Sequence, residues 1–282
     1  MTDPDFVVPF ARLPKRFAES IENPPAVPVP PRPAATIALL RVGHAGLEVL
    51  LLRRTRSAGF VPGAYVFPGG RVDASDAASE IVARMDGLDG PAAARRLQLP
   101  DGDPPALAYY LAAVREAFEE TGILVGLGPQ GTPPATAAED PEVDVLRDDL
   151  MEDRTGFADV LDRMECRIDG EALEYFAHWI TPEVEPRRFD TRFFAAKVGA
   201  DADTIVDPRE MSDAVWLTPV EALARYDDGS LPMVFPTIKT LEQFEAYGSV
   251  DDALTDMRQT TVPTILPRLV ITPTGVGMEL DE

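Results

Sequence analysis

The sequence predicts a globular α/β fold, in which strands are interleaved with helices that each bury one face. Two β-rich runs lie near the start, at residues 36–42 and 47–54. Residues 106–120 repeat apolar side chains at helical spacing, and three more strand-like runs precede a pair of helices. With 282 residues, 45% of them hydrophobic, the chain is long enough for one large domain or two small ones around a buried core.

The first part of the chain predicts an arm followed by a hairpin. Residues 1–35 form a proline-rich N-terminal arm, which favours extended backbone over helix. The glycine-containing loop at residues 43–46 separates the two β-rich runs, as in a hairpin. A third short strand, at residues 65–67, runs into Pro68-Gly69-Gly70. This triplet predicts a sharp turn that another group approaches closely.

A change of composition interrupts the chain at residues 74–104. This stretch is rich in Ala, Asp, Gly and Pro, and we interpret it as a surface insertion with helices at 74–85 and 91–97. The helix predicted at residues 106–120 then buries Leu111, Val114 and Phe118 along one stripe. Gly122 is placed to end that helix.

The C-terminal half alternates between helices and strands. Residues 139–165 have helical spacing, and strands are predicted at 173–180, 189–198 and 214–217. Helices follow at 219–226, where Thr218 is the expected cap, and at 236–247. The main domain is predicted to span residues 36–258, and the proline-punctuated segment 259–282 to be a C-terminal tail.

The charge and the cysteine and histidine counts limit which partners and catalytic groups are expected. The 48 acidic and 26 basic residues give a formal charge of -22, which disfavours a nucleic acid polymer as partner. A small phosphate ester would need divalent cations or an arginine cluster at its site. One cysteine and no long apolar run favour a cytoplasmic protein that does not span a membrane. Only two histidines are present, so carboxylates are the expected catalytic groups.

Three glutamates share one face of the helix at 106–120. Glu116, Glu119 and Glu120 stand at positions i, i+3 and i+4. Such a group suits a hard divalent cation, Mg²⁺ or Mn²⁺, that activates water beside a phosphate. Arg115 is placed to pair with Glu119. The alternative is a solvated acidic helix face with local salt bridges.

These residues resemble the Nudix family, whose box reads G-x5-E-x7-R-E-U-x-E-E-x-G-U, where U is a bulky apolar residue. Phe67-Pro68-Gly69-Gly70 matches its entry and the run from Arg115 to Ile123 its exit. The resemblance implies an α/β/α sandwich with a mixed sheet, here with a helical insertion within the box and a C-terminal helical extension. It also implies that Glu116, Glu119 and Glu120 bind metal with the Gly70 carbonyl, and that Arg115 orients the glutamates.

The box is interrupted in this chain. Gly70 and Arg115 are 45 positions apart instead of the 14 that the box has, so 31 extra residues separate its halves. Counted back from Arg115, the first glutamate of the box falls on Leu107, whereas counted forward from Gly70 it falls on Asp76. Asp73 and Asp76 are therefore only candidates for that carboxylate.

An interrupted box is similar to the branch of the family that includes peroxisomal coenzyme A diphosphatases. The runs 175–182 and 187–194 also resemble that branch. The resemblance implies cleavage of coenzyme A or its thioesters into phosphopantetheine and adenosine 3',5'-diphosphate. ADP-ribose or NADH is the alternative substrate, and a Nudix-fold sensor that binds a nucleotide without cleaving it is the alternative of another class. The chain could also form a homodimer.

Other residues are candidates with alternatives beside them. Glu210 either serves the metal or the water, as glutamates on this loop do in many Nudix enzymes, or is a surface residue. Arg187, Arg188 and Arg192 either bind phosphate or form local salt bridges. Arg54 faces phosphate or water, and Phe60 and Tyr65 either stack an adenine or simply pack. His178 is expected to be a hydrogen-bonded core residue.

Overall fold

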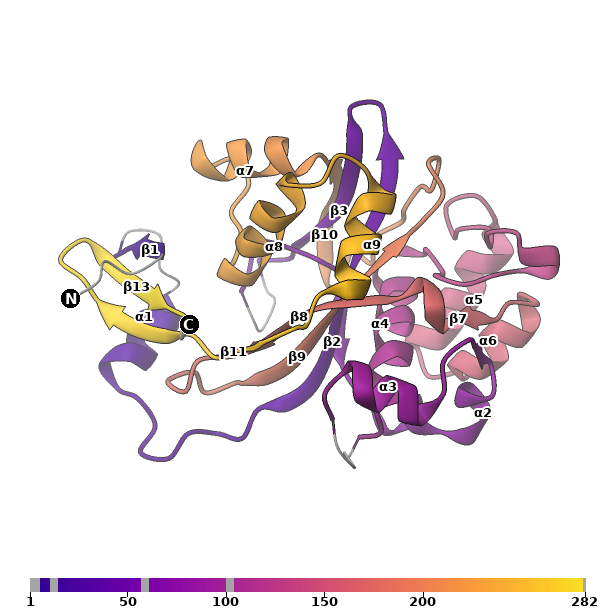
Figure 1. Cartoon of the computed structure of the whole chain (residues 1–282), viewed down its shortest axis with the longest axis horizontal. Helices are drawn as coiled ribbons and strands as arrows, with labels where there is room; N and C mark the ends of the chain where they lie inside the picture. The colour runs from indigo at the N-terminus through magenta and orange to yellow at the C-terminus, as the bar shows by residue number, and fades with distance from the viewer. Residues whose placement is uncertain (1–5, 11–14, 57–60, 100–103, 281–282) are drawn as a thin grey trace.

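A mixed β-sheet lies between two groups of helices in the computed structural model, which describes all residues except 1–5, 11–14, 57–60, 100–103 and 281–282 (Figure 1). Its strands are β2 (Arg32–Gly43), β3 (Gly46–Arg54), β4 (Tyr65–Val66), β5 (Gly69–Arg71), β8 (Glu174–Ile180), β9 (Phe189–Lys197), β10 (Met211–Leu217) and β11 (Thr264–Ile265). The main path is β10-β3-β2-β9-β8-β11, with β4 beside β3 and β5 beside β2. The predicted α/β sandwich is confirmed.

Helices cover both faces of the sheet. On one face pack α2 (Ser79–Val82), α3 (Gly90–Arg96), α4 (Ala106–Thr121), α5 (Pro141–Met151) and α6 (Phe157–Arg163), and on the other α7 (Pro219–Asp227), α8 (Phe235–Glu245) and α9 (Val250–Gln259). Short 3-10 turns lie at Ala74–Ala77, Pro129–Gly131 and Gly170–Ala172. No helix among the described residues combines the length and apolar character needed to cross a bilayer.

Strand β2 explains how one sheet supports two cores. It pairs in parallel with β9 and antiparallel with β3 and β5. Ile37 and Leu39 pack toward α4, whereas Ala38 and Leu40 pack toward α8. Because side chains alternate along a strand, a strand buried on both faces is apolar at nearly every position. The sequence therefore shows an unbroken apolar run there.

Helix α4 was predicted correctly. Leu111, Val114 and Phe118 are fully buried against the sheet and the neighbouring helices. Gly122 ends the helix with a left-handed φ of 72°, and its N–H donates to the Phe118 carbonyl at 2.9 Å. A side chain at Gly122 would also collide with Ala137. This end of the helix therefore requires glycine.

The segment between β5 and α4 is not the surface insertion that its composition predicted. The single helix expected at 74–85 is broken at Ala78, whose backbone is extended. Ile81, Leu88 and Leu97 are buried in the same core cluster as α4. Strand β6 (Met85–Asp86) pairs with β7 (Ile168–Asp169). A few well-spaced apolar side chains thus make this segment part of the core, although its overall composition is polar.

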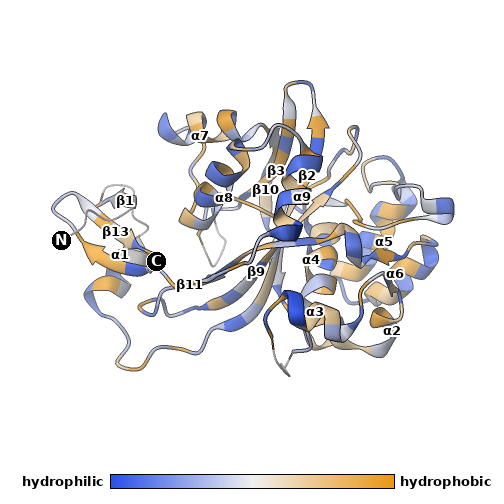
Figure 2. Ribbon diagram, in the orientation of Figure 1, coloured by the Kyte–Doolittle hydropathy of each residue, from blue (hydrophilic) through white to orange (hydrophobic). Residues whose placement is uncertain are grey.

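The two ends of the chain form a second small sheet, which we call the terminal sheet. It consists of β1 (Phe6–Pro9), β13 (Gly275–Glu279) and β12 (Arg268–Ile271), in that order. The helix α1 (Lys15–Glu22) follows β1, and β1 lies beside β13 (Figure 1). The sequence predicted an extended arm and a tail, and it did not indicate the helix α1 or the pairing of β1 with β13. Hydrophobic residues along β13 are visible in Figure 2.

Candidate active site

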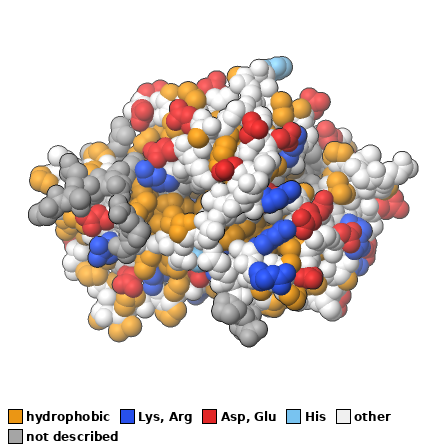
Figure 3. Space-filling view, viewed as in Figure 1, with side chains coloured by type: hydrophobic (Ala, Val, Ile, Leu, Met, Phe, Trp, Pro, Cys, Tyr) orange, Lys and Arg blue, Asp and Glu red, His pale blue; other side chains and the backbone are white. Residues whose placement is uncertain are grey.

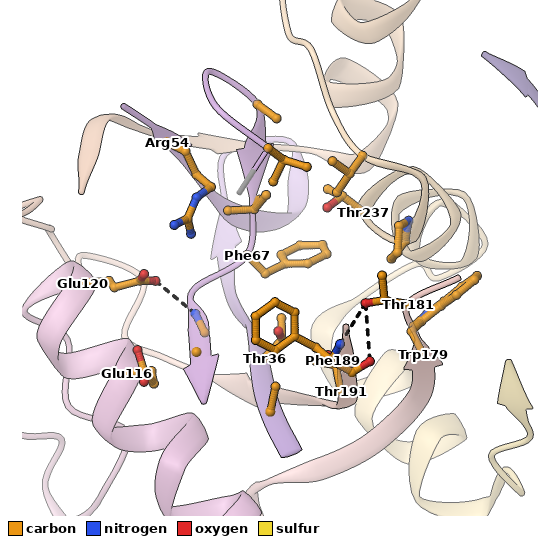
Figure 4. Close-up of a pocket in the computed structure, with 18 of the residues that line it drawn as sticks. Thr36, Arg54, Phe67, Glu116, Glu120, Trp179, Thr181, Phe189, Thr191 and Thr237 are labelled. Carbon is orange, nitrogen blue, oxygen red and sulfur yellow. Dashed lines mark hydrogen bonds between the residues drawn. The ribbon is translucent and has the colours of Figure 1, made fainter. Parts of the chain in front are cut away.

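A cavity of about 1270 Å³ opens between α4, the first strands and the helices of the opposite face. Figure 4 shows Glu116, Glu120 and Arg54 on one side of it and Trp179 on the other. Glu119, Gly69 and Gly70 also line the cavity. The two halves of the interrupted box, far apart in the sequence, therefore meet at one place.

The paired glycines form strand β5 and hold the backbone against α4. The Gly69 N–H donates to the Glu120 carboxylate at 3.0 Å. A Cβ at Gly70 would overlap the Glu116 carboxylate. The chain bends at Pro68, as the predicted turn requires, and the two glycines then begin a short strand paired with β2; the predicted close approach to the glycine backbone is present. Only glycine leaves room for the carboxylate at this position.

Arg115 connects the carboxylates of the site. Its Nη1 donates to both Glu116 and Glu119 at 3.0 Å. Its Nε and Nη2 donate to Asp76 at 2.8 and 3.0 Å. Burial opposes the charge of Arg115, but its partners, Asp76 foremost, raise its pKa above the ordinary value. The guanidinium therefore stays charged and fixes the orientation of two glutamates.

Asp76 is the carboxylate found by counting forward from Gly70. Its side chain is only 2% exposed, and it forms a two-bond ion pair with Arg115. Leu107, found by counting back, is a core residue. Asp73 lies 3.8 Å from Arg115 and is half exposed. Asp76 therefore stands where the box has its first glutamate, six positions after Gly70, and the 31 additional residues lie between Asp76 and Arg115.

Burial raises the pKa of all three glutamates. The pKa of Glu116 rises to about 7 through burial and the charge of Glu119, although Arg115 opposes the shift. Burial, and then the charge of Glu116, hold the pKa of Glu120 well above its usual range. The pKa of Glu119 is also raised, mainly by burial. Such crowding of acidic groups in a buried place is relieved when a cation binds between them.

The three glutamate side chains do not surround a single cation position in this structure. Among the described residues, no three acidic, histidine or cysteine side chains are arranged as a complete metal site. Arg115 donates hydrogen bonds to Glu116 and Glu119, and the Gly69 N–H donates one to Glu120. The donor set nevertheless fits a hard cation, because it consists of carboxylate oxygens beside exposed backbone. Each bond to Arg115 uses one oxygen of its carboxylate, Oε1 of Glu116 and Oε2 of Glu119, so the second oxygen can bind a cation while Arg115 keeps its bonds.

Two further predicted residues, Arg54 and Glu210, line the cavity. Arg54 lines the cavity, its Nε is buried, and this atom has no hydrogen-bond partner within the described chain. Glu210 lines the cavity and is close enough to raise the pKa of Glu120. Sequence reasoning missed Arg71 and Arg209, which also line the cavity. Arg71 directly follows the two glycines and Arg209 directly precedes Glu210, so both were detectable as neighbours of motif residues.

The arginines around β9 divide between the two faces of the sheet. Arg187 lines the cavity. Arg188 instead donates to the backbone oxygens of Thr181 and Val29, at 2.9 Å each. Arg192 pairs with Asp190 and lies over a tyrosine ring. Both were predicted to bind substrate, yet neither lines the cavity, because alternate residues of an extended segment point in opposite directions.

The remaining predictions concern aromatic residues and a histidine. Phe60 lies outside the described residues. The Tyr65 hydroxyl donates to Asp213 at 2.6 Å and the residue does not line the cavity, so it packs instead of stacking on a base. His178 hydrogen-bonds to Asp190 at 2.6 Å and to Thr264 at 2.9 Å. The expectation of a hydrogen-bonded core histidine is confirmed.

The sandwich and the glutamate helix define a Nudix protein. The crystal structure of a Nudix hydrolase from Alicyclobacillus acidocaldarius superposes with a TM-score of 0.65 and 28% identity, covering 80% of this chain and 96% of that one. The family model described as the NUDT19 Nudix domain matches residues 26–244. The chain therefore belongs to the NUDT19 Nudix domain family.

Two curated relatives carry the same family name. The acyl-coenzyme A diphosphatase NUDT19 of Xenopus laevis is 30% identical over 233 residues, covering 73% of this chain and 61% of that protein. The human protein of that name is 30% identical over 237 residues, covering 73% of this chain and 63% of that protein. This chain thus aligns with about three-fifths of the length of each.

Proposed function

We propose that this chain is a hydrolase that cuts the diphosphate linkage of coenzyme A or an acyl-coenzyme A with the help of Mg²⁺ or Mn²⁺. The observation that carries the proposal is the meeting of Glu116, Glu119 and Glu120 with the glycine backbone at one end of a large cavity. The names of the relatives in the same family supply the substrate class. We also propose that it acts on this small molecule in the cytoplasm.

The three glutamates, with the Gly70 carbonyl, are the residues that would hold the cation. When bound, the cation would neutralise charge on the diphosphate and make a water molecule more acidic. Arg115 keeps the glutamates oriented from behind through its bonds to Glu116 and Glu119. Arg115 lines the cavity beside these glutamates, and its side chain is largely buried by them and by Asp76.

Two other cavity residues, Arg54 and Glu210, are placed to bind the substrate and to accept a proton. Arg54, with an unpaired buried Nε, is placed to donate to a phosphate oxygen. Glu210 is placed to accept the proton of the attacking water. The water oxygen forms a new bond to phosphorus, the bridging P–O bond breaks, and the displaced phosphate leaves with the electron pair of that bond. One phosphate product then carries each half of the substrate.

The first experiment is a mass-spectrometric screen with Mg²⁺ or Mn²⁺ against coenzyme A, acetyl-coenzyme A, ADP-ribose, NADH and diadenosine polyphosphates. The proposal predicts release of phosphopantetheine, or its acyl form, together with adenosine 3',5'-diphosphate. Cleavage of ADP-ribose or NADH alone would overturn the substrate while keeping the chemistry. If no compound is cut, the hydrolase proposal fails and a nucleotide sensor becomes the better explanation.

Two controls test the cation and the glutamates. EDTA should abolish turnover and excess Mg²⁺ should restore it, whereas turnover that persists in EDTA contradicts the cation. Glu119→Gln should lower kcat by roughly a hundredfold or more, since a neutral amide is a poor ligand for a hard cation. Glu142→Gln is the matched control, because Glu142 is exposed at the start of α5 and does not line the cavity.

A further inference from the structure

The cavity continues well beyond the glutamates into a second part, which we call the apolar half. Aromatic and aliphatic side chains wall it, among them Phe67, Trp179, Phe189, Phe193, Phe235 and Met278. In Figure 4, Phe67 and Phe189 lie between the glutamates and Trp179. Figure 3 shows hydrophobic side chains gathered in a hollow on the same side as the terminal sheet.

One part of this wall comes from the end of the chain. Met278 belongs to β13 of the terminal sheet, and Pro267 precedes β12. Met278 packs against the core cluster that contains Phe67, Trp179 and Phe235. The family match ends at residue 244, so these two residues lie outside the part of the chain that the family model describes.

We infer that the apolar half binds the hydrocarbon chain of an acyl group, and that Met278 contacts the far end of that chain. The inference rests on the proposed function, since the acyl group must belong to a substrate whose diphosphate lies at the glutamates. Continuity favours this occupant, because the glutamates and Met278 line the same cavity. Size favours it as well: the cavity of about 1270 Å³ exceeds the roughly 300–1,000 Å³ of ordinary small-molecule sites.

The chemistry of the wall distinguishes a hydrocarbon chain from the other parts of the substrate. Adenine, phosphate and the pantetheine amides all need hydrogen-bond partners when they leave water. The aromatic rings and Met278 offer dispersion contacts, and the polar groups beside them are uncharged: Thr181, Thr191, Thr237 and the Trp179 indole. A methionine is also flexible enough to adapt to chains of different lengths.

The test measures binding without turnover. Isothermal titration in EDTA, below the micelle concentration, compares coenzyme A with its butyryl and dodecanoyl thioesters. The parent protein should bind the dodecanoyl thioester at least tenfold more tightly than coenzyme A, because each buried methylene contributes roughly a factor of four. Equal affinities would overturn the inference.

Variants at Met278 assign the effect to the terminal sheet. Met278→Ala should reduce the dodecanoyl preference by about fivefold. Met278→Trp should reduce it as well, but leave the butyryl affinity unchanged, because a larger side chain shortens the groove. Ile271→Ala is the control, since Ile271 lies on β12 of the same hairpin, is 68% exposed and does not line the cavity. Equal preferences in the parent and both Met278 variants would refute the role of this residue.

The two proposals fail in different ways. Chain-length-dependent binding without cleavage of any compound would leave the apolar half in place and overturn the hydrolase. Cleavage of coenzyme A and its thioesters, with no dependence of affinity on chain length, would keep the hydrolase and overturn the apolar half. Thermal unfolding of each variant shows whether a lost preference reflects the site or a loss of folded protein.

Discussion

Replacing Asp76 with asparagine tests whether the ion pair behind the glutamates holds the site together. Asp76 is 2% exposed and accepts two hydrogen bonds from Arg115, at 2.8 and 3.0 Å. Removing one partner of a buried ion pair destabilises a protein by about 3–5 kcal/mol. We expect about 3 kcal/mol, because Arg115 keeps Glu116 and Glu119 as partners.

The expected destabilisation is large enough to measure by thermal unfolding. A protein of this size loses about 2–4 °C of Tm per kcal/mol, so Asp76→Asn should unfold about 6–12 °C lower. Asp73→Asn is the matched control: Asp73 is half exposed and 3.8 Å from the same arginine, and its Tm should change by less than about 2 °C. Circular dichroism before heating shows that both variants are folded. A Tm for Asp76→Asn within 2 °C of the control would refute the structural role of this pair.

Three further predictions follow from buried groups. Glu120→Gln should raise the Tm of the EDTA-treated protein while lowering kcat at least a hundredfold, since it removes a buried carboxyl group that the folded protein must either protonate or keep charged beside Glu116; a lower Tm in EDTA contradicts this account of the crowding. Leu97→Ala should lower the free energy of unfolding, measured by urea titration, by about 2–5 kcal/mol. Val145→Ala, at an exposed site on α5, should change that free energy little, and equal effects of the two substitutions would contradict the burial of the segment between β5 and α4. Burial and Glu165 raise the pKa of Cys166 to about 11, so at pH 8.5 iodoacetamide should react roughly a hundredfold faster in urea than with the folded protein, and equal rates would contradict the burial. Because the unfolded thiol loses its proton first, this residue's contribution to stability should decline as the pH rises from about 9 through 11.

Local signals in the sequence predicted the elements whose causes are local. Helix α4 was predicted from the spacing of Leu111, Val114 and Phe118, and its end from Gly122. Thr218 caps α7 as expected, accepting a hydrogen bond from the Glu221 N–H at 3.2 Å. In each case the residues that determine the element lie within one or two helical turns of one another. A single window of sequence therefore contains enough information.

The terminal sheet and the arginines of β9 could not be predicted in this way. Phe6 pairs with Met278, and no turn joins the two strands, so no local pattern marks the partnership. Arg188 and Arg192 were chosen for their charge, but the direction of the Arg192 side chain depends on the register of β9 against β2 and β8, and Arg188 lies in the loop before β9. Register is decided by the packing of both faces, which the linear sequence does not display.

The forward count to Asp76 shows where sequence reasoning was nearly sufficient. Two alignments of the interrupted box were open, and only one placed a carboxylate at the missing position. The structure distinguishes them, because Asp76 contacts Arg115 and Leu107 contacts the core. The surface location predicted for residues 74–104 failed for the opposite reason. Average composition hid the few apolar residues, such as Ile81 and Leu97, that enter the core.

The pairing of β1 with β13 also determines when the cavity is completed during synthesis. The ribosome releases Phe6 long before Met278, so β1 must wait for more than 260 further residues before its partner strand emerges. The central sheet, with β2 already paired to β9, can form in the meantime. Closing so long a loop is slow and depends on the rest of the fold having brought the ends together. The wall that contains Met278 should therefore be the last part of the cavity to assemble and, in a stalled or shortened chain, the first to be missing.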